Sequence, residues 1–159
     1  MPSRSTMFRA LLVILIFVVV GPLVGLVVFS VGMGGLAVLG GRPDGLWLSP
    51  FFMLYGLLFA HSAGLTWALV AGVAALVLEA TERLKAGLIG PVSGIVSCAI
   101  ATSTGAVWLP PDTQTTTFAE VADSFALGFA AVMLAVHVIS ASAGWWLART
   151  LVRQRPRDV

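Results

Sequence analysis

The sequence predicts an all-α, polytopic membrane protein, a single bundle of four transmembrane helices with both termini in the cytoplasm. Composition is the first reason, because 58% of the 159 residues are hydrophobic and only 10% are charged. A soluble domain carries about 25% charged residues, so this chain could not cover its surface in water. The other two reasons are four long charge-free runs and an uneven placement of Lys and Arg.

The charge-free runs divide the chain into four. They lie between residues 9 and 42, 44 and 79, 85 and 112, and 123 and 149. Each exceeds the roughly 18 apolar residues that predict a spanning helix. We expect one domain over residues 1–150, with helices at about 7–30, 49–80, 88–109 and 118–149 and then a basic cytoplasmic tail at 150–159.

The first run begins like a secretory signal, with basic residues ahead of an apolar stretch. That stretch continues to Leu39, well beyond the roughly 7–15 apolar residues of a signal peptide, so we expect an uncleaved helix. Gly21 and Pro22 predict a kink in it, because proline removes a backbone hydrogen bond. The glycine-rich residues 32–41 predict that the helix ends near Ser30 and that a partly embedded segment follows.

The second run has a well-marked start, since Ser49 can cap a helix and Pro50 suits its first position. Its apolar part spans about 42 Å, more than the roughly 30 Å of a bilayer core, so we expect a tilted spanning helix. Small residues recur along it at every fourth position and form one ridge. They are Gly56, Ala60, Gly64, Ala68 and Gly72.

The third and fourth runs have similar ridges. Pro110 and Pro111 end the third helix, and a capping box formed by Thr117 and Glu120 starts the fourth at Phe118. Ridge residues at a spacing of four are Gly90, Gly94, Cys98 and Thr102 in the third helix, and Ser140, Gly144 and Ala148 in the fourth. Such ridges let helices approach closely in lipid. Packing within one bundle is the favoured interpretation, and pairing with another subunit is the alternative.

Eight of the nine Lys and Arg lie on one predicted side of the membrane. They occupy the N-terminus, the loop between the second and third helices, and the C-terminal tail, whereas Arg42 alone lies on the other side. The positive-inside rule then places both termini in the cytoplasm. This pattern also accounts for the sequence pI of about 9.3, so we expect the lipid bilayer, and no nucleic acid, as a partner.

Two histidines, His61 and His137, are the only ones in the chain. Both are expected about 15–20 Å deep, near the middle of the bilayer, and each has a glycine on its own helix face. The favoured interpretation is that neutral imidazoles hydrogen-bond neighbouring helices. The alternatives are a b-type haem held between the two side chains and a relay for protons or substrate.

No Asp, Glu, Lys or Arg lies deep in any of the four runs. The chain therefore lacks the membrane glutamate on which small multidrug exporters depend. The single cysteine, Cys98, excludes an intramolecular disulfide, and it forms no recognisable nucleophile–base pair with the serines. These observations predict a protein that is not an enzyme and that holds no metal.

The Gly-Pro-x-x-Gly motif at residues 21–25 and the Tyr55-Gly56 pair resemble a group of small, uncharacterised four-helix membrane proteins of alphaproteobacteria. The resemblance implies a location in the bacterial inner membrane and implies no activity. We expect a non-catalytic accessory or assembly subunit that acts through helix contacts with another membrane protein or with a second copy. The alternatives are a small homo-oligomeric permease or channel and, third, an electron carrier that binds haem through His61 and His137.

Overall fold

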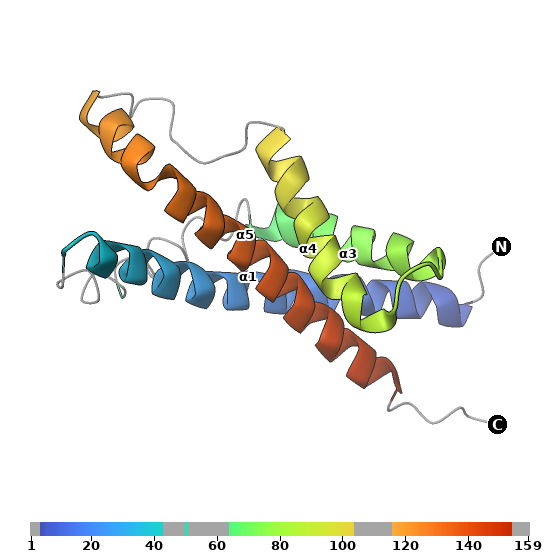
Figure 1. Ribbon diagram of the computed structural model, residues 1–159. Helices are drawn as coiled ribbons and strands as arrows, with labels where there is room; N and C mark the ends of the chain where they lie inside the picture. The colour runs from blue at the N-terminus through green and yellow to red at the C-terminus, as the bar shows by residue number, and fades with distance from the viewer. Residues whose placement is uncertain (1–3, 43–49, 51–63, 104–115, 154–159) are drawn as a thin grey trace.

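The described part of the chain is built from helices. The structure, a computed structural model, describes residues 4–42, 50, 64–103 and 116–153. Its helices, labelled as in Figure 1, are α1 (Arg4–Leu39), α3 (Leu65–Ala80), α4 (Ala86–Ser103) and α5 (Thr116–Arg153). The all-α class predicted from the sequence is confirmed for these residues.

Three of the described helices are long and apolar enough to cross a membrane. The qualifying stretches are Thr6–Leu39, Ala86–Ser103 and Gly128–Val152. The remaining helix, α3, is apolar and has 16 residues. Residues 51–63 of the helix expected at 49–80 lie outside the described part of the chain.

The four described helices form a closed bundle in which each helix packs against two main neighbours. α1 packs against α3 and α5, and α4 packs against the same two helices from the other side. α5 crosses α1 obliquely (Figure 1). The first turn of α1, the turn between α3 and α4, and the last turn of α5 all lie at one end of the molecule (Figure 1). We refer to this end as the basic end, because it carries Arg9, Arg83, Lys85 and Arg149.

α1 is longer than expected. It continues through Pro22 and through the glycine-rich stretch to Leu39, so the prediction that it ends near Ser30 is wrong. The reason is packing against α5, where a Cβ added at Gly32 would lie 2.8 Å from a methyl group of Val132. This close approach stabilises a helical segment that its own glycines disfavour by about 1 kcal/mol each.

A Schellman motif ends α1. Gly41 has a φ of +78°, a left-handed conformation that glycine adopts without a steric penalty. The Arg42 N–H donates to the Ala37 carbonyl at 2.9 Å, and the Gly41 N–H donates to the Val38 carbonyl at 3.0 Å. These two bonds satisfy carbonyls that have no partner within the helix.

The turn between α3 and α4 is short, as the sequence predicts for neighbouring antiparallel helices. Thr81 ends α3 by donating its hydroxyl to the Leu78 carbonyl at 2.8 Å. Glu82 then takes a φ of +55° and reverses the chain. α4 begins at Ala86, within a turn of its expected start, and α5 extends beyond both expected ends, 118 and 149, by less than two turns.

The core of the described bundle is small and apolar, and it lies nearer the basic end. Phe17 is its largest fully buried side chain, with 1% of its surface exposed. The other members of this buried cluster come from all four helices. They are Val13, Ile16, Ala71, Ala75, Ile89, Ala141, Trp145 and Ala148.

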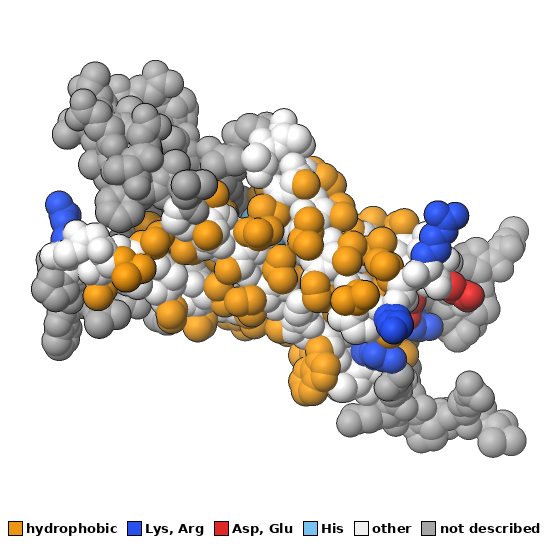
Figure 2. Space-filling model, viewed as in Figure 1, with side chains coloured by type: hydrophobic (Ala, Val, Ile, Leu, Met, Phe, Trp, Pro, Cys, Tyr) orange, Lys and Arg blue, Asp and Glu red, His pale blue; other side chains and the backbone are white. Residues whose placement is uncertain are grey.

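Large apolar side chains cover the outside of the molecule. Figure 2 shows them across its middle, with most of the visible charged side chains gathered at the basic end. A regular row runs along α1 at every fourth residue, with exposures between 49% and 65%. Its members are Met7, Leu11, Leu15, Val19, Leu23, Val27 and Val31.

Candidate functional site

Two glycines of α4 lie directly against the backbone of α5. A Cβ added at Gly94 would lie 2.6 Å from the His137 carbonyl oxygen and 2.7 Å from the Val138 Cα. One turn away, a Cβ at Gly90 would lie 2.8 Å from the Ser142 Cα. Because these neighbours are backbone atoms, they cannot move aside. Gly90 and Gly94 therefore let the two backbones touch.

Phe17 of α1 occupies the space between two other glycines of the ridges. A Cβ at Gly72 of α3 would lie 3.3 Å from the Phe17 Cβ. A Cβ at Gly144 of α5 would lie 3.4 Å from the Phe17 ring. One aromatic side chain thus joins three helices, and glycine on either side makes room for it.

Two further ridge residues also face α1. A Cβ at Gly21 would lie 3.4 Å from the Ala68 Cβ of α3. A Cβ at Gly25 would lie 3.2 Å from the Ser140 Oγ of α5. The Ser140 hydroxyl is buried and has no hydrogen-bond partner among the described residues, whereas Ser97 of α4 donates to the Trp67 carbonyl of α3 at 3.2 Å.

His137 hydrogen-bonds within its own helix. Its Nδ1 lies 2.8 Å from the Met133 carbonyl oxygen, one turn earlier in α5. Because a carbonyl accepts only, Nδ1 carries the proton, and in the neutral ring Nε2 is then left as an acceptor. The bond from His137 to a neighbouring helix that the sequence predicts is absent from the contacts of the described residues.

The other predicted site residues of the second helix are only partly described. His61, Gly56 and Ala60 lie outside the described residues, so the expected pairing of His61 with His137 has no geometry here. Gly64 directly precedes α3 and is partly buried. In the part of the chain that the structure describes, no three His, Cys, Asp or Glu side chains gather as a metal site would require.

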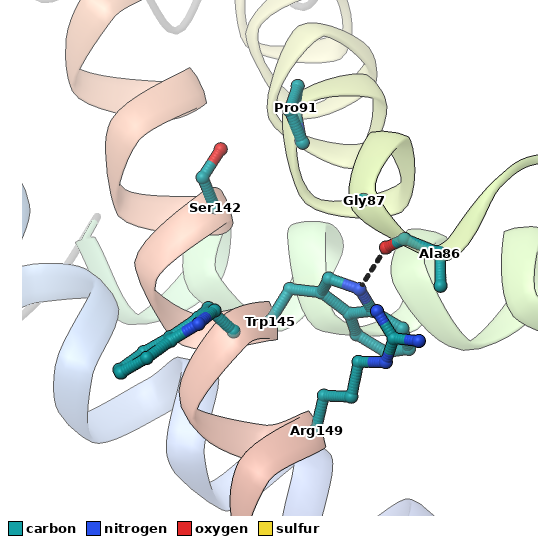
Figure 3. Close-up of a pocket in the computed structure, with 7 residues that line it drawn as sticks. Ala86, Gly87, Pro91, Ser142, Trp145 and Arg149 are labelled. Carbon is teal, nitrogen blue, oxygen red and sulfur yellow. Dashed lines mark hydrogen bonds between the residues drawn. The ribbon is translucent and has the colours of Figure 1, made fainter.

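Two polar contacts between helices lie at the basic end. Arg9 of α1 forms a salt bridge with Glu79 of α3. Trp145 of α5 is 5% exposed, and its indole Nε1–H donates to the Ala86 carbonyl at the start of α4 at 2.7 Å (Figure 3). The first contact joins α1 to α3 and the second joins α5 to α4, at the end where most of the described charged residues lie.

Two shallow hollows flank the Trp145 indole at this end. The first, of about 230 Å³, lies between α4 and α5 (Figure 3). The second, of about 210 Å³, opens toward α1 and α3 and is also lined by Arg9 and Glu79. Ala86, Trp145 and Arg149 line both hollows.

Arg149 is not among the site residues that the sequence predicts. Its only signal is the spacing of four residues from Trp145, which places both side chains on one face of α5. The pairing of that face with the start of α4 is visible only in three dimensions. Comparison with protein-family models, with curated proteins and with solved structures finds no match to this chain.

Proposed function

We propose that the protein is a non-catalytic accessory or assembly subunit of a bacterial inner membrane, and that it acts through helix contacts with another membrane protein. The observation that carries this proposal is the contrast between its interior and its surface. Phe17 and the ridge glycines close the interior of the described bundle. The regular α1 row from Met7 to Val31 leaves an apolar face open to lipid or to another helix.

The proposed orientation places the basic end in the cytoplasm. Arg9, Arg83, Lys85 and Arg149 lie at this end of the described helices, and Arg42 follows the other end of α1. Lys and Arg are enriched in cytoplasmic loops. Trp145 and Trp146 also belong to the basic end, and tryptophan is enriched at the membrane interface.

A permease or channel made of several copies is the second candidate, favoured by the same open face of α1. The position of Phe17 determines where a solute could pass through such an assembly. A path along the axis of one copy would have to displace this side chain, which is 1% exposed and packed between α3 and α5. A solute path would therefore lie between copies.

An electron carrier with a b-type haem is the third candidate. It is favoured by His137, whose Nδ1–H is held by the Met133 carbonyl. This arrangement leaves Nε2 as the ligand nitrogen, as in many histidines that bind metals. The second ligand would be His61.

Gentle purification of the full chain in a mild detergent separates the three candidates. An accessory role predicts that a larger membrane protein co-purifies in a fixed ratio and that the preparation is colourless. A permease predicts a defined homo-oligomer and solute flux in liposomes. A haem carrier predicts a Soret band that is lost in His137→Phe. A colourless monomer without flux or partner would contradict all three.

A further inference from the structure

The first hollow at the basic end holds a positive charge that no described neighbour compensates. Arg149 is partly buried, and among the described residues it forms no salt bridge or hydrogen bond with another side chain. Among the described residues, it is the only charged one that lines this hollow. In the second hollow the charge of Glu79 is already paired with Arg9. The described lining of each hollow therefore carries the uncompensated positive charge of Arg149.

The hollow is also open beside Gly87. Gly87 lines it, and a Cβ added at Gly87 would meet no atom within 4 Å. Figure 3 shows the Arg149 side chain reaching from α5 toward the start of α4, beside the Trp145 indole. The guanidinium thus borders free space at the end of the molecule that carries the interface tryptophans.

Exposed apolar side chains extend from the hollow along both helices that form it, and we call these two rows the α4 and α5 tracks. On α4, Leu88 and Ile95 are about half exposed and share a face with Pro91, which lines the hollow. On α5, Trp146 is 68% exposed and Ile139 is 46% exposed, and both share a face with Ser142. A ligand that follows these tracks must be anionic at one end and apolar along its length.

From this juxtaposition we infer a binding site for an anionic phospholipid of the cytoplasmic leaflet. Its phosphodiester lies in the hollow and accepts hydrogen bonds from the Arg149 guanidinium, which matches phosphate oxygens with its planar fork of donors. Its acyl chains lie along the α4 and α5 tracks. Basic hollows between membrane helices on the cytoplasmic side bind lipid headgroups in this manner. The inference rests on the proposed membrane location and orientation.

The test is a titration of the detergent-solubilised full chain with phosphatidylglycerol or phosphatidylcholine, read by native mass spectrometry. We expect the wild type to retain phosphatidylglycerol in preference to phosphatidylcholine. A basic residue near anionic lipid contributes about 1 kcal/mol, or roughly a fivefold change in affinity. Arg149→Gln should therefore weaken phosphatidylglycerol binding about fivefold, and Arg42→Gln, the matched loss of charge at the other end, should leave it unchanged.

A second pair of variants tests the hollow itself without removing a charge. Gly87→Leu fills it and should weaken phosphatidylglycerol binding. Gly35→Leu is the control, because a Cβ there also meets no atom within 4 Å but lies on α1, away from the hollow. Both variants must elute as the wild type does, which shows that they are folded.

Several results would overturn the inference. Equal retention of the two lipids, equal effects of Arg149→Gln and Arg42→Gln, or displacement of the lipid by excess inorganic phosphate would each do so, the last because it indicates a site for free anions. A separate measurement isolates the proposed membrane location. If alkaline carbonate releases the chain from membranes, that location is wrong, whereas an integral protein without lipid preference contradicts the lipid site alone.

Discussion

The Phe17 ring of α1 lies directly against the backbone of Gly144 in α5, where a Cβ would stand 3.4 Å from the ring. Gly72 of α3 bounds the same side chain on its other side. In lipid, helices gain little from the hydrophobic effect, so their association depends on close packing. The packing of Phe17 against these two glycines therefore stabilises the association of α1, α3 and α5.

The first prediction concerns the Phe17 side chain. Phe17→Ala should lower the free energy of unfolding by about 3–5 kcal/mol, the usual cost of a cavity of this size in a packed core. Leu15→Ala is the control on the same helix, because Leu15 is 59% exposed and its loss leaves no internal cavity. Denaturant titration in mild detergent measures both, and equal losses would show that Phe17 is not a central packing residue.

The second prediction concerns the contact between α4 and α5. Gly94→Ala should destabilise the bundle by about 1–3 kcal/mol, because the added methyl group would meet the His137 backbone and force the helices apart. Gly87→Ala makes the same change on the same helix in open space. It should be neutral or stabilise by up to about 1 kcal/mol, since alanine favours helix more than glycine does. Thermal unfolding in detergent distinguishes the two, and a neutral Gly94→Ala would contradict the close contact.

The sequence predicts much of this architecture, whereas specific parts depend on contacts between residues far apart in the chain. Charge-free runs identify the helices because a long apolar helix needs no information from its neighbours. The helical segment after Ser30 could not be predicted, because it depends on the contact of Gly32 with Val132, a residue about a hundred positions away.

The candidate site illustrates the same limit. The spacing of small residues shows that a ridge exists but not which helix it faces. Gly90 and Gly94 meet α5, whereas Ala68 and Gly72 meet α1. Apart from its spacing of four residues from Trp145, Arg149 gives no signal in the sequence, since a basic residue near the end of an apolar helix is ordinary. Its significance depends on the hollow that α4 and α5 form together.

The third prediction compares two serines at helix interfaces. Ser97→Ala removes the hydrogen bond to the Trp67 carbonyl and should cost about 0.6 kcal/mol, the average for such bonds between membrane helices. Ser140→Ala removes a buried hydroxyl without a partner among the described residues, so it should be neutral or stabilising. The same denaturant titration measures both. A larger loss for Ser140→Ala would reveal a bond from residues beyond the described ranges.

The fourth prediction tests the proposed orientation by cysteine labelling. Cys98→Ser first removes the single native thiol. Arg42→Cys and Arg83→Cys then place one thiol at each end of the bundle, and both positions are exposed. Because the basic end is proposed to be cytoplasmic, a membrane-impermeant maleimide should label Arg42→Cys in intact spheroplasts and should label Arg83→Cys only after lysis. The reverse pattern would place the start of α1 and the end of α5 outside the cytoplasm. It would also remove the cytoplasmic leaflet as the source of a lipid for Arg149.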